Sequence, residues 1–211
     1  MKEKIKKFLT DEERRRIEEK VREAEASTSG EIVVMAVGES SNYPSAIMAA
    51  SGAISLVLAI GGTMLYGSEN LWVFLTLFAL FFIASNEAVK RIPALKRPFV
   101  SRAEIAEEVE EAAIHSFYHR KVHETRDRTG ILIYISLYEH SVKVLADSGI
   151  DAVVGKQVWQ EVVDTITKGI RDGRQGEAIG QAVGICGKLL SQHFPCKADD
   201  ANELADSVII G

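Results

Sequence analysis

The sequence lacks the residues that build a disulfide framework or a cysteine-based zinc site. Its two cysteines, Cys186 and Cys196, form neither a CxxC pair nor a Cys/His spacing typical of zinc ligands. Excess positive charge is also missing, because the formal net charge is −5, and this balance argues against a nucleic-acid partner. The segment Met1–Gly30 has no apolar core of the kind that a secretory signal needs. The sequence also contains no CxxxxxR loop, no Walker A motif and no GxSxG motif, so it has none of these three catalytic or phosphate-binding signatures.

Charged residues are absent from two adjacent stretches in the first half of the chain. Ser40–Ser68 and Asn70–Asn86 contain no Asp, Glu, Lys or Arg, and a single glutamate separates them. Their apolar runs, Ala46–Tyr66 and Leu71–Asn86, approach the roughly 20 helical residues that cross a bilayer core of about 30 Å. Neither run has the polar stripe of a soluble amphipathic helix. The pattern predicts a transmembrane helical hairpin at residues 46–86, with a buried hairpin of a soluble protein as the alternative.

Basic residues flank this hairpin mainly on one side. The connector Gly67–Asn70 has no Lys or Arg, whereas the second run is followed by Lys90, Arg91, Lys96, Arg97 and Arg102. Because Lys and Arg are retained on the cytoplasmic side of membranes, we expect a multi-pass membrane protein whose soluble parts are cytoplasmic. The lipid bilayer is therefore one partner that the sequence predicts.

The rest of the chain alternates helical and strand patterns. Thr10–Glu13 is typical of a capping box that starts a helix to about residue 26, and Glu31–Val37 is typical of a strand buried on both faces. Later segments are predicted as a helix at 101–124, adjacent strands at 131–136 and 142–146, and helices at 155–172 and 177–193. The predicted fold is α/β: a small mixed β-sheet with helices on both faces, interrupted by the two-helix transmembrane hairpin.

This order makes the soluble domain discontinuous in sequence. Residues 1–45 and 91–195 are expected to form one α/β domain, and residues 46–86 the inserted hairpin. Residues 196–211 are expected to be a mobile C-terminal tail, whose end at Ser207–Ile210 could add a short strand. Close packing of the last helix on a neighbour is expected at its glycines, Gly180, Gly184 and Gly187.

Three histidines recur at helical spacing. His115, His119 and His123 occupy positions i, i+4 and i+8 of the helix predicted at 101–124, so they are expected along one side of it. Two histidines one turn apart are a common basis for zinc binding, and His115 with His119 is the candidate pair. A partly solvated helix edge explains the same spacing without a metal ion.

A charged turn precedes the second predicted strand. Phosphatase chemistry needs a nucleophile or an activated water and positive groups for the phosphoryl oxygens, and Arg126, Asp127 and Arg128 could supply part of this set or form a salt-bridged surface turn. Asp147 and Asp151 follow the third strand, where acidic residues serve either as a site or as turn and N-cap residues. The residues alone leave both interpretations open at each position.

The order of these segments resembles a known family. The TPM domain, whose family includes a thylakoid-lumen protein described as an acid phosphatase, is similar in three places: TSGEIVVMAV, TGILIYISLYEHSVKVLADSGI and IRDGRQGEAIGQAV. A bacterial membrane subgroup of that family, whose function is uncharacterised, is also similar in the final LLSQHFP. The resemblance covers about residues 10–195, with the hairpin as an insertion.

The resemblance carries expectations about chemistry. Some TPM domains bind calcium through acidic residues near strand ends, and the matching positions here hold Asp127, Asp147 and Asp151. Phosphatase activity has been proposed for a few members, and Arg126 and Arg128 would then contact the phosphate. The family often has an acidic or amide residue directly before the glycine that opens the second strand, whereas this chain has a threonine there.

Because the sequence assembles no catalytic constellation, the leading hypothesis is non-enzymatic. It is a membrane-anchored TPM-like domain that binds a membrane-associated protein partner or assists the assembly of a complex. The alternative is a metal-dependent phosphatase that hydrolyses phosphomonoesters with a divalent cation such as calcium. A third interpretation is a scaffold whose contact is the hairpin. The sequence does not name the substrate, the partner or the oligomeric state.

Overall fold

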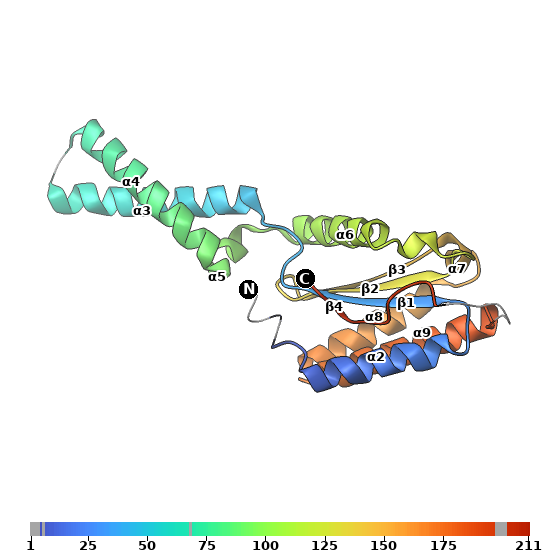
Figure 1. Ribbon diagram of the computed structural model, residues 1–211. Coiled ribbons are helices and arrows are strands. Elements are labelled where there is room, and N and C mark those ends of the chain that lie inside the picture. The colour runs from blue at the N-terminus through green and yellow to red at the C-terminus, as the bar shows by residue number, and fades with distance from the viewer. Residues whose placement is uncertain (1–4, 6, 68, 197–201) are drawn as a thin grey trace. The chain divides into compact units, whose positions relative to one another are not determined.

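The protein forms two compact units that interrupt each other in sequence. The computed structural model describes residues 5, 7–67, 69–196 and 202–211 (Figure 1). The sheet unit comprises residues 1–40 and 107–211, and the hairpin unit comprises residues 41–106. The sheet unit is therefore discontinuous, because the hairpin unit is inserted after its first strand.

Parallel pairing of two strands forms the centre of the sheet unit. β1 (Glu31–Val37) pairs in parallel with β2 (Gly130–Ser136), residue for residue along their length. β3 (Ser141–Ala146) follows β2 through a short reversal and pairs with it antiparallel, as predicted. β4 (Ile209–Ile210) pairs in parallel with β1, so the end of the chain adds the short strand expected there. The described residues thus form a four-stranded mixed sheet with the order β3-β2-β1-β4.

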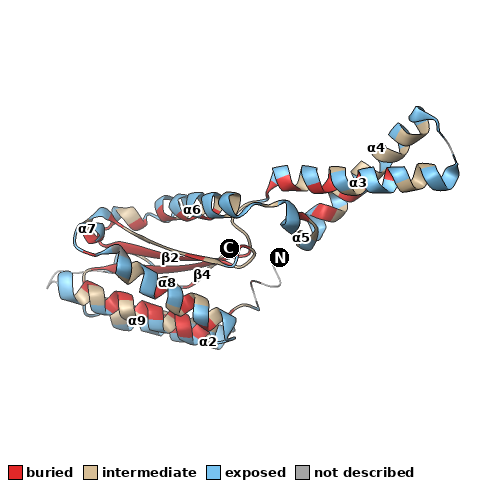
Figure 2. Cartoon of the chain, turned by 180° about the vertical axis from the view of Figure 1, so that it is seen from behind, coloured by how far each residue is buried: buried red, intermediate tan, exposed pale blue. Residues whose placement is uncertain are grey.

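Helices cover both faces of this sheet, which confirms the predicted fold class. α2 (Asp11–Glu25), α8 (Lys156–Arg171) and α9 (Gln175–His193) lie on one face (Figure 1). The part of α6 (Arg102–His119) that belongs to the sheet unit lies on the other (Figure 2). Every residue of β1 and β2 is buried, as expected for strands covered on both sides. Since side chains alternate along a strand, the core beneath α2, α8 and α9 takes every second residue: Ile32, Val34, Ala36, Ile131, Ile133 and Ile135.

α2 begins as the local sequence predicts. The Thr10 hydroxyl accepts a hydrogen bond from the Glu13 N–H (3.2 Å), and the Glu13 carboxylate accepts one from the Thr10 N–H (2.8 Å). This reciprocal capping box satisfies two N–H groups at the start of the helix. One turn further on, Ile17 and Val21 begin the buried face, where each side chain is 1% exposed.

α9 contacts α2 closely at some of its glycines and not at others. Its apolar face is buried as predicted, at Ile179, Val183, Cys186 and Leu190. A Cβ added to Gly187 would lie 2.5 Å from the Cβ of Ala24, so the two helices can approach only because Gly187 has no side chain. A Cβ added to Gly184 would meet no atom within 4 Å. The expected close packing therefore holds at Gly187 and is wrong at Gly184.

The hairpin unit contains two long apolar helices. Within the described residues, α3 (Pro44–Tyr66) and α4 (Leu71–Arg91) are long and apolar enough to cross a membrane, and each has a mean hydropathy of 1.8. Only 22% of the apolar window of α3 and 11% of that of α4 is buried, so most of this surface is exposed. α4 extends past its predicted end at residue 86, because Glu87, Lys90 and Arg91 suit a helix and the two cations favour its C-terminal dipole.

Small side chains, rather than glycines, provide the buried positions of α3. These positions are Ala46, Ala50, Ser51, Ser55 and Ala59. The hydroxyls of Ser51 and Ser55 donate hydrogen bonds of 2.6 Å to carbonyl oxygens one turn earlier, so they remain satisfied without a partner from α4. The sequence also suggests Gly52, Ser55 and Gly61–Gly62 as contact positions between the two apolar helices. Ser55 is buried and a Cβ on Gly62 would lie 3.2 Å from the Leu77 side chain, whereas a Cβ on Gly52 or Gly61 would meet no atom within 4 Å, so the expectation is wrong at those two glycines.

Short elements complete the connections. In the hairpin unit, α5 (Pro93–Lys96) and the 3₁₀ helix η1 (Arg97–Phe99) follow α4 and pack against α3. In the sheet unit, the 3₁₀ helix η2 (Val122–Glu124) precedes β2, and α7 (Ser148–Asp151) follows β3. The two prolines of the linker stand at helix starts, where the missing N–H of proline costs nothing.

Two substitutions in α9 should affect stability in opposite directions. Gly187→Ala should lower the free energy of unfolding by about 1–2 kcal/mol, because overpacking against Ala24 outweighs the better helix propensity of alanine. Gly184→Ala should raise it by about 0.5–1 kcal/mol, because its methyl group enters open space. Urea unfolding of the detergent-solubilised chain, followed by Trp159 fluorescence in a Trp72→Phe background, measures both. Effects of the same sign and size would contradict this packing.

Candidate functional site

The predicted histidine cluster is only partly assembled. His115 and His119 lie on the exposed side of α6, with their rings stacked at a centroid distance of 5.7 Å. α6 ends at His119 because Lys121 adopts a left-handed conformation with φ of 60°, so the helix predicted to residue 124 is too long. His123 therefore lies in η2, where its ring meets the ring of Tyr118 at 4.7 Å. The i+8 position does not extend the pair along the helix.

The charged turn before β2 packs against the start of α7. The Gly149 N–H donates to the Arg128 carbonyl oxygen (3.1 Å), and a Cβ on Gly149 would lie 2.6 Å from that oxygen. Asp147 caps α7 by accepting from the Ser148 N–H (2.7 Å), and its second oxygen lies 3.9 Å from the Arg128 guanidinium. Asp151 is exposed at the last position of α7. Asp147 thus has the structural role, N-cap and ion-pair partner, that the sequence left open.

The described residues contain no group of three or more His, Cys, Asp or Glu side chains that could hold a metal ion. The calcium assignment to Asp127, Asp147 and Asp151 and the zinc assignment to His115 and His119 therefore gain no support and stay predictions. In the turn itself, the side chain of Arg128 donates to the His123 carbonyl oxygen (2.6 Å), and the backbone N–H of Arg126 donates to Glu203 (3.0 Å). Phosphate binding by these two arginines likewise stays a prediction.

Cysteine chemistry is limited by burial. Cys186 lies in the core of the sheet unit, Cys196 is exposed, and no disulfide joins them. Burial raises the pKa of the Cys186 thiol to about 12, so it remains protonated and unreactive at neutral pH. Cys186 is therefore a packing residue.

A buried polar network occupies the carboxyl ends of β1 and β2. Glu139 is 8% exposed; one of its oxygens accepts from the Ser40 N–H (3.0 Å) and the other from the Ser136 hydroxyl. The Ser40 hydroxyl also lies 3.2 Å from the Tyr134 hydroxyl. Burial, with the charge of Glu139 nearby, raises the pKa of Tyr134 and keeps the phenol neutral. The sequence places Glu139 in a reversal and gives no sign of this network, which is internally satisfied.

A second cluster of carboxylates lies at the opposite end of β1. Glu25 accepts from the Ile32 N–H (2.8 Å) and Glu31 from the Glu203 N–H (3.0 Å), next to a cavity of about 270 Å³. Burial raises the pKa of Glu25 to about 8, and the nearby charges of Glu31 and Asp206 add to this rise. Burial likewise raises the pKa of Glu31. Glu31 holds the C-terminal segment beside β1, whereas Glu25 joins the end of α2 to β1. No pattern in the sequence indicates that these two carboxylates are withdrawn from water.

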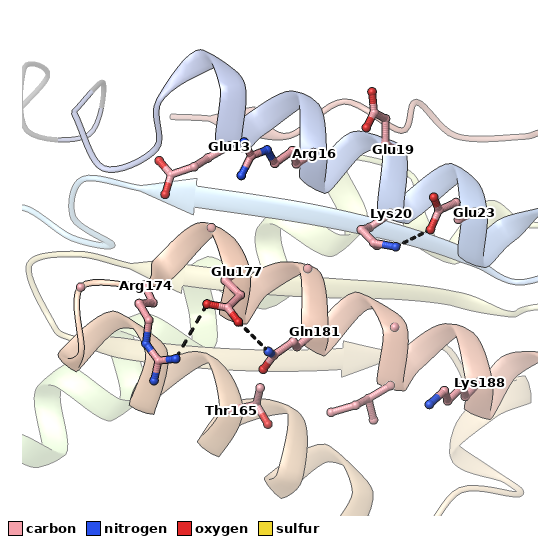
Figure 3. A pocket seen from close by; sticks show the side chains of 15 residues that line it. Glu13, Arg16, Glu19, Lys20, Glu23, Thr165, Arg174, Glu177, Gln181 and Lys188 are labelled. Atoms are coloured by element: carbon pink, nitrogen blue, oxygen red, sulfur yellow. Dashed lines mark hydrogen bonds and ion pairs between the residues drawn. The ribbon is translucent and has the colours of Figure 1, made fainter.

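An open groove of about 960 Å³ lies between α2 and α9 and reaches α8 at Thr165 (Figure 3). Its walls bear four acidic side chains, Glu13, Glu19, Glu23 and Glu177, and four basic ones, Arg16, Lys20, Arg174 and Lys188. Some of these charges pair within a wall: Lys20 with Glu23 at 2.5 Å, and Arg174 with Glu177 at 3.8 Å. The walls therefore present charges of both signs with little net charge.

Glycines line the α9 side of this groove. Gly176, Gly180 and Gly184 follow one another at four-residue intervals along α9. A Cβ added to Gly176 would lie 2.7 Å from the Glu13 side chain. At Gly180 it would meet only the Lys20 side chain at 3.7 Å, and at Gly184 it would meet no atom within 4 Å. The sequence singled out Gly180 and Gly184 for close packing. Their spacing suits close approach of a second helix, but no residue of the described chain packs against Gly184.

Comparison with known proteins identifies similarity to one domain family and one solved structure. The family model of the TPM domain matches residues 99–188, from the end of η1 into α9. The NMR structure of BA42 protein from the psychrophilic bacterium Bizionia argentinensis is 22% identical, with a TM-score of 0.60 over 97% of this chain and 96% of that chain. At this identity the likeness concerns the fold alone. No curated protein gives a significant match.

The carboxylate cluster predicts an unusual pH dependence of stability. Folded Glu25, with a pKa of about 8, holds a proton that the unfolded chain releases near its ordinary value of 4.5. The free energy of unfolding should therefore fall as pH rises from 5 to 8, by about 2 kcal/mol after allowance for solvent screening. Glu25→Gln should reduce this fall, leaving the part that comes from the raised pKa of Glu31, and should stabilise the protein at pH 8. Urea unfolding monitored by Trp159 fluorescence across this range measures the effect.

Glu23→Gln is the matched control for this substitution. Glu23 lies on the exposed side of α2 and pairs with Lys20, so its neutralisation should leave the pH profile unchanged. A wild-type stability that rises between pH 5 and 8 would contradict the raised pKa of Glu25.

Proposed function

The chain contains a TPM domain, and we propose that this domain is a membrane-anchored module that binds a protein partner through the groove between α2 and α9. The observation that carries the proposal is the groove itself: its α9 side leaves glycine backbone uncovered, and its walls bear charges of both signs. At the strand ends, hydrogen bonds within the chain engage both carboxylate oxygens of Glu139 and one oxygen each of Glu25 and Glu31. They offer less to a ligand than the open groove does.

The anchor in this proposal is the hairpin unit. Large apolar side chains are exposed along α3 and α4, including Leu65 at 92%, Met64 at 77% and Trp72 at 75%. Soluble proteins rarely leave a continuous apolar surface of this kind in water, and transfer from water stabilises by about 25 cal/mol for each Å². Insertion into a bilayer removes this surface from water. The cytoplasmic location of the sheet unit is part of the proposal and is supported by the basic residues after α4.

The groove favours a peptide segment over a small molecule. Small-molecule sites are mostly enclosed and apolar with a few convergent polar groups, whereas this groove is open and bears charged side chains on both walls. Gly184 is uncovered and Gly180 has only the Lys20 side chain in front of it, so a partner backbone or helix can come close to α9 there. Charges of both signs along the walls suit a partner of mixed charge, for which complementary pairs would fix register and orientation.

A bulky residue in the groove tests this function. Gly184→Phe has space for its side chain and should leave the fold intact, but it should fill the position that the partner approaches. A photo-crosslinking residue at Gln181, on the groove wall, should capture a discrete membrane-associated protein in native membranes. That crosslink should drop at least tenfold with Gly184→Phe.

Glu111→Phe on the exposed side of α6 is the matched control and should leave the crosslink unchanged. Unfolding midpoints of both variants, compared with the wild type, confirm that the fold is retained. Equal crosslinking with the groove filled would overturn the assignment of the partner site.

Phosphatase activity is the competing function, and it has its own test. The Asp147 carboxylate is already engaged by the start of α7 and by Arg128, so we expect no phosphomonoester hydrolysis that depends on it. Asp147→Asn keeps the side-chain oxygen that caps α7 and should lower the free energy of unfolding only slightly, by about 0.5 kcal/mol, through loss of the ion pair with Arg128. The assay is hydrolysis of a generic phosphomonoester with calcium or zinc. Activity that both Asp127→Asn and Asp147→Asn abolish, with the fold retained, would favour the enzyme.

A further inference from the structure

Cations gather at one end of the hairpin unit. Residues 41–106 contain five Lys or Arg side chains, and all of them lie between Lys90 and Arg102. α4 ends at Arg91, and α5 and η1 then pack against α3, so this basic segment closes the open end of the hairpin. The connector between α3 and α4, at the other end, has a glutamate and no cation.

Two of these cations already have partners inside the unit. The Arg91 guanidinium pairs with Glu87 at 2.8 Å. Lys96 is 3% exposed; its ammonium donates to the Asn42 carbonyl oxygen at 3.3 Å and lies 5.4 Å from the ring centroid of the buried Tyr43. Lys96 thus fixes the basic segment against the start of α3 and is not available to a ligand.

The other three cations are exposed. Lys90, Arg97 and Arg102 make no side-chain ion pair or hydrogen bond within the part of the chain that the structure describes. Exposed apolar side chains alternate with them in sequence, because Ile92 is 49% exposed and Phe99 is 41% exposed. The result is a mixed cationic and apolar surface, directly continuous with the apolar helix α4.

We propose that this surface, the hairpin collar (Lys90, Ile92, Arg97, Phe99 and Arg102), binds the anionic headgroups of lipids in the adjoining leaflet. The inference rests on the proposed membrane anchor. Apolar side chains such as Ile92 and Phe99 suit the interface between acyl chains and headgroups, whereas Lys and Arg suit the phosphate layer just outside it. Charge complementarity selects anionic lipids over zwitterionic ones, since each cation near an anionic surface contributes roughly fivefold in affinity.

The same geometry argues against other anionic partners. The exposed apolar residues would gain nothing from free phosphate in water, but they leave water when the collar enters a headgroup layer. The formal net charge of −5 for the whole chain disfavours nucleic acid. A lipid surface is the partner that uses both the cations and the apolar residues.

Lipid preference can be measured on the full chain in nonionic detergent by native mass spectrometry. Phosphatidylglycerol and phosphatidylcholine with identical acyl chains are the two probes. The wild type should prefer phosphatidylglycerol at least tenfold, and 0.5 M salt should reduce this preference because it screens surface charges. The triple variant Lys90→Gln/Arg97→Gln/Arg102→Gln should bring the preference below threefold.

A second triple variant, Arg120→Gln/Lys168→Gln/Arg171→Gln, is the matched control. It removes three exposed cations from the sheet unit, so it changes the net charge equally and should keep the preference. A wild type without preference, or equal losses in both triple variants, would overturn the proposal. Displacement of phosphatidylglycerol by millimolar inorganic phosphate would also overturn it, because the site would then recognise the phosphate ion alone.

Carbonate extraction of native membranes separates this proposal from the membrane anchor on which it rests. A chain that stays in the membrane but shows no lipid preference would overturn the collar and retain the anchor. A chain that carbonate extracts would overturn both. Retention of both triple variants in the membrane shows that the substitutions act on headgroup recognition and not on insertion.

Discussion

Seven residue pairs between β1 and β2 join two segments that the hairpin separates in sequence. Parallel strands require a crossover connection, and here that connection contains the whole hairpin unit as well as α6. Both strands are buried on both faces, so loss of the pairing would expose apolar side chains on each of them. β4 can pair with β1, and the helices of the first face have a surface to cover, only because this pairing exists.

The two ends of the paired strands carry polar groups at different energetic cost. At the carboxyl ends, Glu139 is surrounded by hydrogen-bond donors, and burial there is compensated. At the other end, the half-buried Glu25 and the buried Glu31 lie near Asp206, and their pKa values rise because water has been removed and like charges are close. Glutamates of this region also attach the C-terminal segment to α2 and β1, and these hydrogen bonds offset part of the cost.

Anchoring and recognition would fall to different units of the chain. The hairpin unit has an exposed apolar surface with cations at one end, whereas the sheet unit has the groove between α2 and α9. A membrane anchor would confine the sheet unit to the same membrane as its partner, and confinement raises the effective concentration of the two. Recognition then needs only modest affinity, for which an open groove of mixed charge is suited.

Local patterns in the sequence were sufficient wherever the responsible interactions are local. The capping box at Thr10–Glu13, the buried run Glu31–Val37 and the apolar face of α9 depend on neighbours within a few residues, and the structure confirms each of them. The end of α6 was predicted wrongly because Lys121 takes a left-handed conformation. Glycine usually occupies this conformation at a helix end, so a lysine there gives no signal in the sequence.

Other features depend on which distant segment lies alongside. The sequence does not distinguish Gly184 from Gly187 as a packing position. In the structure Ala24 of α2 packs against Gly187, whereas a Cβ on Gly184 would meet open space. Glu31 accepts backbone hydrogen bonds from the C-terminal segment, which lies more than 170 residues away in the sequence. The amino-acid sequence by itself determined the helices, the strands and the apolar hairpin, because hydrophobic period and capping act over short distances. Only the tertiary structure decided which polar groups are buried and which glycines are uncovered, because burial depends on contacts between residues far apart in the chain.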